Sequence, residues 1–211
     1  MQPEGVALGY GISDSSGGQS VDFVAGEYII NEQSAGDEAS AFVAQVSGRT
    51  VLAEGWNLMA ALGYTRFSRL SPDGSTAVTA DNGGNALAPN GDFASRFSLL
   101  NPIASVTHTG FEQPLTFAGE YITNTWAAGP YNTGWALGAA YSVSKKPGDW
   151  RLYYQYQDIE QDAVLTPFAQ DDFLRVSRFR GHLAGWQYQL QDDVQLDLWG
   201  MLTTRKTGIP T

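Results

Sequence analysis

Apolar and polar residues alternate with a period of two over much of the chain, and helical periodicity is almost absent. In 134–144 one side reads Trp, Leu, Ala, Tyr and Val, while the other side holds Ala, Gly and Ser. Segments 56–64, 150–157 and 194–202 alternate in the same way. Because successive side chains of a strand point to opposite faces, each segment is expected to have an apolar face and a small or polar face.

The alternation, with turn residues between the segments, predicts ten strands and almost no helix. The expected strands cover 5–12, 21–30, 39–47, 56–68, 95–108, 114–124, 134–144, 149–159, 180–190 and 194–204. Pro102 interrupts the fifth strand, and the third strand is short. The chain is therefore predicted to be all-β and antiparallel, with residues 1–211 in a single domain.

From the second connection onward, longer connections between these strands alternate with shorter ones. The longest are 69–94 and 160–179, and the tightest are 145–148 and 191–193. A transmembrane β-barrel has short periplasmic turns and long outer loops in this alternation. The pattern therefore favours a membrane barrel. A soluble β-sandwich or a lipocalin-like barrel is the alternative, because soluble strands reach similar lengths.

Aromatic residues on the apolar faces support the membrane interpretation. Several lie near strand ends, where the aromatic girdles of a membrane barrel occur. The expected girdle residues are Trp56, Tyr64, Trp135, Tyr141, Trp150, Tyr156, Trp186 and Tyr188. In a soluble fold the same residues would instead form the core.

The composition narrows the classes of protein further. The chain has a net charge of −10, and a surface this acidic repels nucleic acid. Charged residues make up only 16%, below the roughly 25% of ordinary globular domains, as expected if one strand face avoids water. Cysteine is absent, so a disulfide scaffold and a thiol nucleophile are excluded.

Residues on the opposite strand faces are the candidates for a pore lining. The pentapeptide at 25–29 recurs at 118–122, which predicts that Glu27 and Glu120 both lie on the small-residue face. Charges and amides on that face would set the selectivity of a pore, and the excess of acidic residues favours cations weakly. The expected pore-lining residues are Glu27, Glu120, Arg151, Gln155, Gln157, Gln187 and Asp197.

Residues 114–204 resemble the C-terminal part of the bacterial putative porins. The resemblance rests on 114–124, 134–138 and 146–150, and then on the short motifs Tyr-Gln-Tyr, Asp-Ala-Val, Asp-Phe and Gly-His between 154 and 182. It implies a passive diffusion channel in the outer membrane of Gram-negative bacteria, in contact with lipid and lipopolysaccharide. Such proteins resemble trimeric porins, so a homotrimer is one assembly that it implies, although the motifs do not fix the oligomeric state.

The chain departs from the porin pattern after 203, where no final strand closing on a terminal aromatic residue follows. The loop alternation also predicts that both ends of the chain lie on the outer side. We therefore expect the chain to be incomplete at both ends and to form part of a larger barrel, with about twelve or more strands.

Catalytic and metal chemistry finds little support in the sequence. Neither His108 nor His182 has a partner at a spacing that signals a metal site, and Gly-x-Ser-x-Gly is absent. We therefore expect no enzyme activity and no cofactor. The Asp- and Asn-rich segment 71–94 is interpreted as a solvated outer loop, with a calcium-binding or constriction loop as the alternative. The cluster Arg175, Arg178 and Arg180, opposite Asp171 and Asp172, is interpreted as a network of ion pairs, with lipopolysaccharide binding as its alternative.

The leading hypothesis is thus a porin for small hydrophilic solutes or ions. A non-conducting barrel, serving as a structural anchor or as a sleeve around a partner, is the second hypothesis. A barrel enzyme is a third, disfavoured because no serine is placed beside a histidine.

Overall fold

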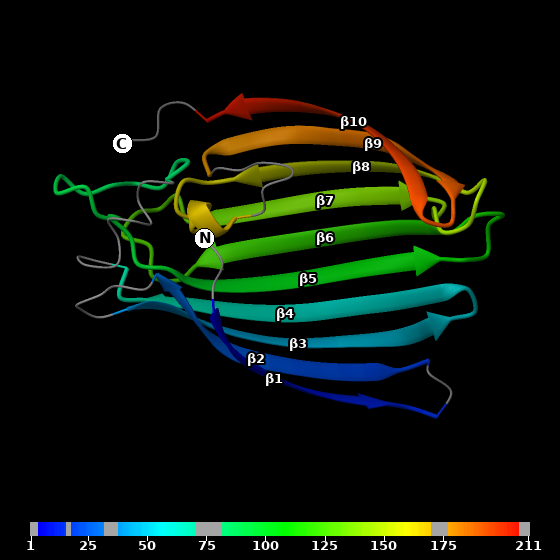
Figure 1. The fold of residues 1–211 in the computed structure, drawn as a ribbon, viewed down its shortest axis with the longest axis horizontal. Helices are drawn as coiled ribbons and strands as arrows, with labels where there is room; N and C mark the ends of the chain where they lie inside the picture. The colour runs from blue at the N-terminus through cyan, green and yellow to red at the C-terminus, as the bar shows by residue number, and fades with distance from the viewer. Residues whose placement is uncertain (1–3, 16–17, 32–37, 71–81, 170–176, 207–211) are drawn as a thin grey trace.

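The chain forms one curved antiparallel sheet in the computed structural model, which describes residues 4–15, 18–31, 38–70, 82–169 and 177–206 (Figure 1). The strands are β1 Glu4–Ser13, β2 Ser20–Asn31, β3 Ala39–Ala53, β4 Trp56–Ser68, β5 Ser98–His108, β6 Leu115–Asn124, β7 Thr133–Tyr141, β8 Trp150–Ile159, β9 Phe179–Gln191 and β10 Val194–Arg205. The short 3-10 helix η1 covers Thr166–Phe168. The prediction of ten antiparallel strands is confirmed.

Each strand pairs with its neighbours in sequence, from β1 to β10, so the sheet is a meander. The sheet is not closed, and β1 and β10 are its two edges (Figure 1). An edge strand presents unpaired backbone N–H and C=O groups. The fold is thus an open sheet in which β1 and β10 each pair with a strand on one side only.

Three strand boundaries differ from the prediction by more than one residue, each for a local reason. β3 continues to Ala53, because the expected connection 48–55 is mostly strand and only residues 54–55 turn. β5 begins at Ser98 rather than 95, since residues 93–97 leave the sheet and pack against it. β7 ends at Tyr141, because Ser142 takes a positive φ of 68° that a strand cannot continue.

The connections differ in length between the two ends of the sheet. The turn end holds short connections such as Glu54–Gly55 and Asp192–Asp193, whereas the loop end holds 69–97 and 160–178. β1 begins and β10 ends at the loop end (Figure 1). The two longest connections therefore share one end of the sheet, as expected, whereas the predicted tight turn 145–148 is part of an eight-residue connection, 142–149, that is as long as 125–132.

The strand register separates the side chains into two faces, because directly paired residues point to the same side. The outer face carries Leu8, Phe23 and Val46 in one neighbourhood and Leu137, Leu152 and Leu198 in another. Most of these side chains are exposed, although they are apolar. The inner face is the opposite one, against which η1 lies in front of the sheet in Figure 1. In the part of the chain that the structure describes, the outer face therefore presents a broad apolar surface.

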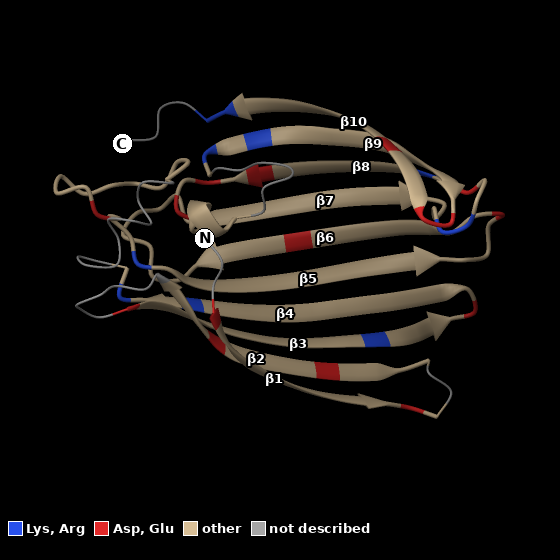
Figure 2. Cartoon of the chain, viewed as in Figure 1, with Lys and Arg blue, Asp and Glu red and all other residues tan. Residues whose placement is uncertain are grey.

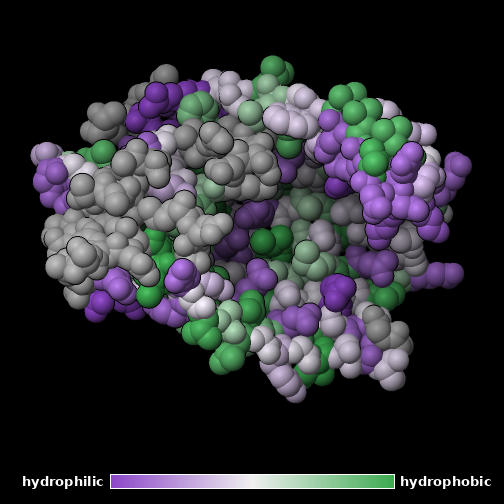
Figure 3. Space-filling model, in the orientation of Figure 1, coloured by the Kyte–Doolittle hydropathy of each residue, from purple (hydrophilic) through white to green (hydrophobic). Residues whose placement is uncertain are grey.

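The hydrophobic core lies on the inner face at the loop end only. Phe93 and Phe97 pack there edge to face, with ring centroids 5.7 Å apart, and Leu165 joins them. They contact inner-face residues of β3, β4 and β5, among them Phe67 and Leu99. No other described residues form such a core on the inner face, and the face seen in Figure 3 is hollowed near its middle. Among the residues that the structure describes, no helix is long and apolar enough to cross a membrane.

Candidate functional site

A polar patch covers the inner face of β8, β9 and β10, and we refer to it as the inner patch. The register places Arg151 beside Gln187, and Gln187 beside Asp197. Four further residues of β8 and β10 lie on the same face, so that the inner patch consists of Arg151, Tyr153, Gln155, Gln157, Gln187, Asp197 and Trp199.

Hydrogen bonds join the centre of the inner patch across three strands. Arg151 Nη1 donates to Gln187 Oε1 at 3.3 Å, and Gln187 Nε2 donates to Asp197 Oδ2 at 2.9 Å. The hydroxyl of Tyr153 donates to the other carboxylate oxygen of Asp197 at 3.2 Å. The carboxylate of Asp197 therefore holds an amide and a phenol in fixed positions.

Gly185 explains how the ring of Tyr153 reaches two strands away. Gly185 pairs with Tyr153 on one side and with Trp199 on the other. A Cβ atom at Gly185 would overlap the phenol ring, so this ring lies across the glycine backbone. The guanidinium carbon of Arg151 lies 5.3 Å from the centre of the same ring.

Two glutamines extend the inner patch toward the loop end. Gln155 Nε2 donates to Gln157 Oε1 at 3.1 Å. Gln157 is only 9% exposed, since it lies where the inner face begins to be covered. Six of the seven predicted pore-lining residues lie on the inner face, and five of them lie in the inner patch.

Glu120 is the sixth of these residues and lies apart from the inner patch, on β6. It accepts a hydrogen bond of 2.9 Å from Asn101 Nδ2, an inner-face neighbour on β5. Glu27 is the exception, because it pairs with Val6 and Phe42 on the outer face. The placement of Glu27 on the small-residue face is therefore wrong. The repeated pentapeptide faces outward with its glutamate in β2 and inward in β6.

All eight predicted girdle residues share the outer face, and they form two groups along the strands. Nearer the turn end, Tyr141 and Trp150 have ring centroids 5.7 Å apart. Nearer the loop end, Trp135 and Tyr156 are 5.2 Å apart. Members of the turn-end group are Trp56, Tyr141, Trp150, Trp186 and Tyr188, and members of the loop-end group are Tyr64, Trp135 and Tyr156.

Charged residues on the outer face of the strands are confined to the loop end. They are Glu4, Glu27, Arg66, Asp158 and Arg180. Asp158 and Arg180 pair directly, one step beyond the row that contains Tyr156. The strands carry few charged residues (Figure 2), and in the strands as described the register places none of them on the outer face between the turn end and this row. Trp150 and Asp158 are eight residues apart, about 26 Å along the strand.

The two long connections are joined by a network of buried hydrogen bonds, which we call the loop clasp (residues 82–97 with 160–168). Asn85 is at its centre and is 5% exposed. Its amide donates to the carbonyls of Gln161 and Val164 at 2.8 and 2.7 Å. Its carbonyl accepts from the backbone N–H and the hydroxyl of Thr166 at 2.9 and 2.7 Å.

Asp162 makes a second connection in the loop clasp. It accepts hydrogen bonds from the N–H of Ala86 at 3.0 Å and from the hydroxyl of Ser95 at 2.6 Å. The interpretation of 71–94 as a solvated outer loop is therefore wrong at Asn82, Asn85 and Phe93, whereas Asn90 in the same segment is exposed. The side chains of Asn82 and Asn85 bind the other connection, and Phe93 anchors the segment to the inner face. Residues 71–81 lie outside the part that the structure describes, as do Arg175, Asp171 and Asp172.

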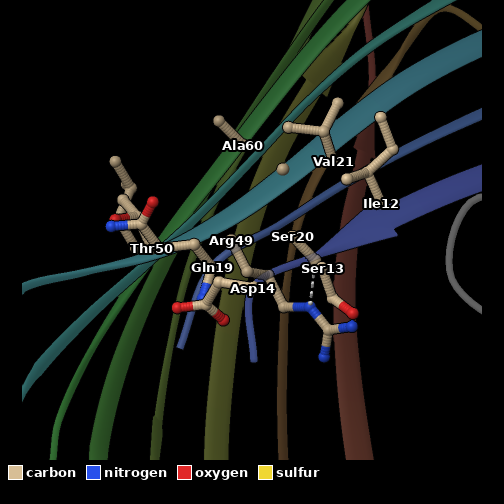
Figure 4. A pocket seen from close by; sticks show the side chains of 11 residues that line it. Ile12, Ser13, Asp14, Gln19, Ser20, Val21, Arg49, Thr50 and Ala60 are labelled. Carbon is tan, nitrogen blue, oxygen red and sulfur yellow. Dashed lines mark hydrogen bonds between the residues drawn. The ribbon is translucent and has the colours of Figure 1, made fainter. Parts of the chain in front are cut away.

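Two cavities lie away from the inner patch. A pocket of about 390 Å³ between the sheet and η1 has an almost wholly apolar lining, including Ile30, Val43 and Phe168. A more open pocket of about 640 Å³ lies at the turn end (Figure 4). Arg49 lines it and donates through Nε to the hydroxyl of Ser20 at 3.4 Å. Neither pocket includes a predicted pore-lining residue.

Both histidines lie on the outer face in aromatic surroundings. His108 stacks against Trp56 with centroids 4.4 Å apart. His182 Nδ1 lies 2.7 Å from the hydroxyl of Tyr154. Among the described residues, no group of three or more His, Asp or Glu side chains is placed to hold a metal ion.

No family model matches the chain, and neither a curated protein nor a solved structure shows significant similarity to it. The functional interpretation therefore rests on the two faces of the sheet, the inner patch and the loop clasp. Sequence reasoning missed Trp199 and Asn85 as parts of these sites. The available signal for Trp199 was a large aromatic residue on the polar side of 194–202. Asn85 could not be found in this way, because its contacts join residues 76 or more positions apart.

Proposed function

We propose that the chain forms the wall of a transmembrane β-barrel in a bacterial outer membrane and acts as a passive diffusion channel for small hydrophilic solutes or ions. The observation that carries this proposal is the opposite chemistry of the two faces. The outer face is apolar and exposed, with an uncharged band between two groups of aromatic residues. The inner face carries hydrogen-bonded amides and charges, which suit a water-filled lumen.

The open edges of the sheet support a larger barrel. Unpaired backbone groups are unfavourable in lipid, and only closed barrels avoid them. We therefore propose that β1 and β10 each pair with a further strand, which gives about twelve or more strands. The outer-face charges at the loop end, such as Arg66 and Arg180, fit the headgroup region of lipid and lipopolysaccharide.

A weak preference for cations is part of the proposal and is supported by the net charge of −10. Charges on the inner face of the strands balance, because three acidic and three basic residues lie there. They are Asp22, Glu120 and Asp197 with Arg49, Arg151 and Arg205. We therefore expect the preference to be small and to come from the loops and the pore mouths.

The loop clasp favours a second candidate function, a barrel that does not conduct and serves as a structural anchor or a sleeve around a partner. Residues 93–97 and 163–168 cover the inner face at the loop end. In a narrow barrel this cover would block the water path. Gln157 is buried beside this cover, whereas in the part of the chain that the structure describes the other members of the inner patch are half-buried or exposed. We therefore prefer the channel.

Reconstitution into planar bilayers distinguishes the two candidates. The channel predicts stepwise ion currents and a reversal potential, under a salt gradient, on the cation side of zero. A protein that inserts into the bilayer without current would support the non-conducting barrel. A clear anion preference would contradict the selectivity, and a protein that remains in solution without detergent would contradict the membrane barrel itself.

A further inference from the structure

The inner patch combines an aromatic surface with side chains that both donate and accept hydrogen bonds. Trp199 lies on the inner face of the edge strand β10, all of whose residues are exposed, and it shares a row with Tyr153 with only Gly185 between them. Two strand spacings separate these two residues, on the order of 10 Å. A large aromatic side chain exposed on the face opposite to the apolar one has no lipid to cover it. Its ring therefore offers an apolar platform inside the proposed lumen.

The polar members of the inner patch are matched to hydroxyl groups rather than to ions. The amides of Gln155 and Gln187 carry both donors and acceptors, as a hydroxyl group does. Arg151 and Asp197 lie on either side of Gln187, and their formal charges cancel. The patch therefore offers no net charge to attract a cation or an anion, whereas it offers many hydrogen bonds to a neutral solute.

We propose that the inner patch is a binding site for neutral polyhydroxylated solutes of the carbohydrate class. A sugar ring has C–H groups that form an apolar face and hydroxyl groups at its edge. Trp199 would contact the apolar face, while Gln187 and Asp197 would hydrogen-bond the edge. This inference rests on the proposed channel, for which it names the class of solute.

Residues 197, 198 and 199 supply a matched test, because the middle one points to the other face. Maltotriose is titrated into the full chain folded in detergent, and binding is measured by calorimetry. The variants Trp199→Ala and Asp197→Asn are expected to weaken binding roughly tenfold. Leu198→Ala on the outer face is expected to bind like the parent chain. Succinate, a charged solute of smaller size, is expected to bind more weakly than maltotriose.

Ion current through the same protein in planar bilayers separates the two levels of the proposal. A current that maltotriose reduces in the parent chain, and reduces much less in Trp199→Ala, supports both. A current with no maltotriose binding, equal binding loss in Leu198→Ala, or tighter binding of succinate overturns the carbohydrate site and leaves the channel standing. Maltotriose binding that depends on Trp199, without any current, supports the site and overturns the channel.

Discussion

The loop clasp should open when Asn85 is replaced by alanine. Asn85 makes four hydrogen bonds to the other connection, two through its amide nitrogen and two through its carbonyl oxygen. The side chain is 5% exposed, so water does not replace these bonds while the clasp stays closed. At about 1 kcal/mol for each hydrogen bond, Asn85→Ala is expected to destabilise the docked loops by about 4 kcal/mol.

A loss of this size changes the equilibrium between closed and open clasp roughly a thousandfold. Amide hydrogen exchange measures that equilibrium, because protection reports local opening. The amides to follow are those of Ala86, Phe168 and Ala169, whose acceptors are Asp162, Leu165 and Thr166 rather than Asn85. Their exchange is expected to accelerate by this factor, while amides in the middle of β7 and β8 keep their rates.

Asn90 supplies the control, because it is the same residue type in the same connection. It is exposed, and its side chain bonds only within the turn, to Asp92. Asn90→Ala is expected to leave the exchange of η1 unchanged. If Asn85→Ala exchanges no faster than Asn90→Ala, the hydrogen bonds do not hold the loops on the sheet and the clasp must be explained by Phe93 and Phe97 alone.

Three further predictions test the faces, the core and a turn. Leu137→Arg on the outer face is expected to destabilise the bilayer-inserted protein by about 2–4 kcal/mol, as measured by denaturant unfolding in vesicles. Ala136→Arg on the inner face is expected to cost much less, and equal losses of stability would contradict the assignment of faces. Phe97 is 0% exposed, so Phe97→Ala is expected to lower the free energy of unfolding by about 3–5 kcal/mol, which is measured as a lower unfolding midpoint. A decrease below about 1 kcal/mol would contradict the packed core at the loop end. Backbone hydrogen bonds from Lys146 and Lys145 lower the pKa of Asp149, so the ionised carboxylate stabilises the turn at pH values above its unfolded pKa. This stabilisation is lost as the pH falls through the lowered pKa. Asp149→Asn is expected to remove that part of the pH dependence of unfolding, and an unchanged pH profile would show that the turn does not depend on the charge.

Much of the architecture follows from local pattern. Period-two alternation and turn residues were sufficient to predict ten strands and the two longest connections at one end of the sheet, because the alternation of side chains is a property of each strand alone. The same pattern placed all eight girdle residues on one face. Five of the seven residues of the inner patch, all except Tyr153 and Trp199, were predicted for the same reason, since 150–157, 186–189 and 195–202 alternate without interruption.

The face of the sheet on which a side chain lies could not be predicted where it depends on the pairing register between strands. The pentapeptides at 25–29 and 118–122 have the same sequence, yet Glu27 points outward and Glu120 inward. A shift of one residue in pairing moves every side chain of a strand to the other face. In each strand the residue that packs on the core at the loop end is a large hydrophobic one, Tyr28 in β2 and Ile122 in β6. The position of the core, and not the pentapeptide, therefore decides which alternate residues of the strand face inward.

Local sequence pattern accounts for strands with one apolar face, for aromatic residues near their ends, and for turns at one end of the sheet with long connections at the other. The fold was needed to show that the two long connections bind each other through Asn85, because that contact joins residues 76 or more positions apart. It was also needed to show that Tyr153, Asp197 and Trp199 share one face, with Gly185 between Tyr153 and Trp199. Alternation along a strand is local physics, whereas register and loop docking depend on partners that lie far away in the chain.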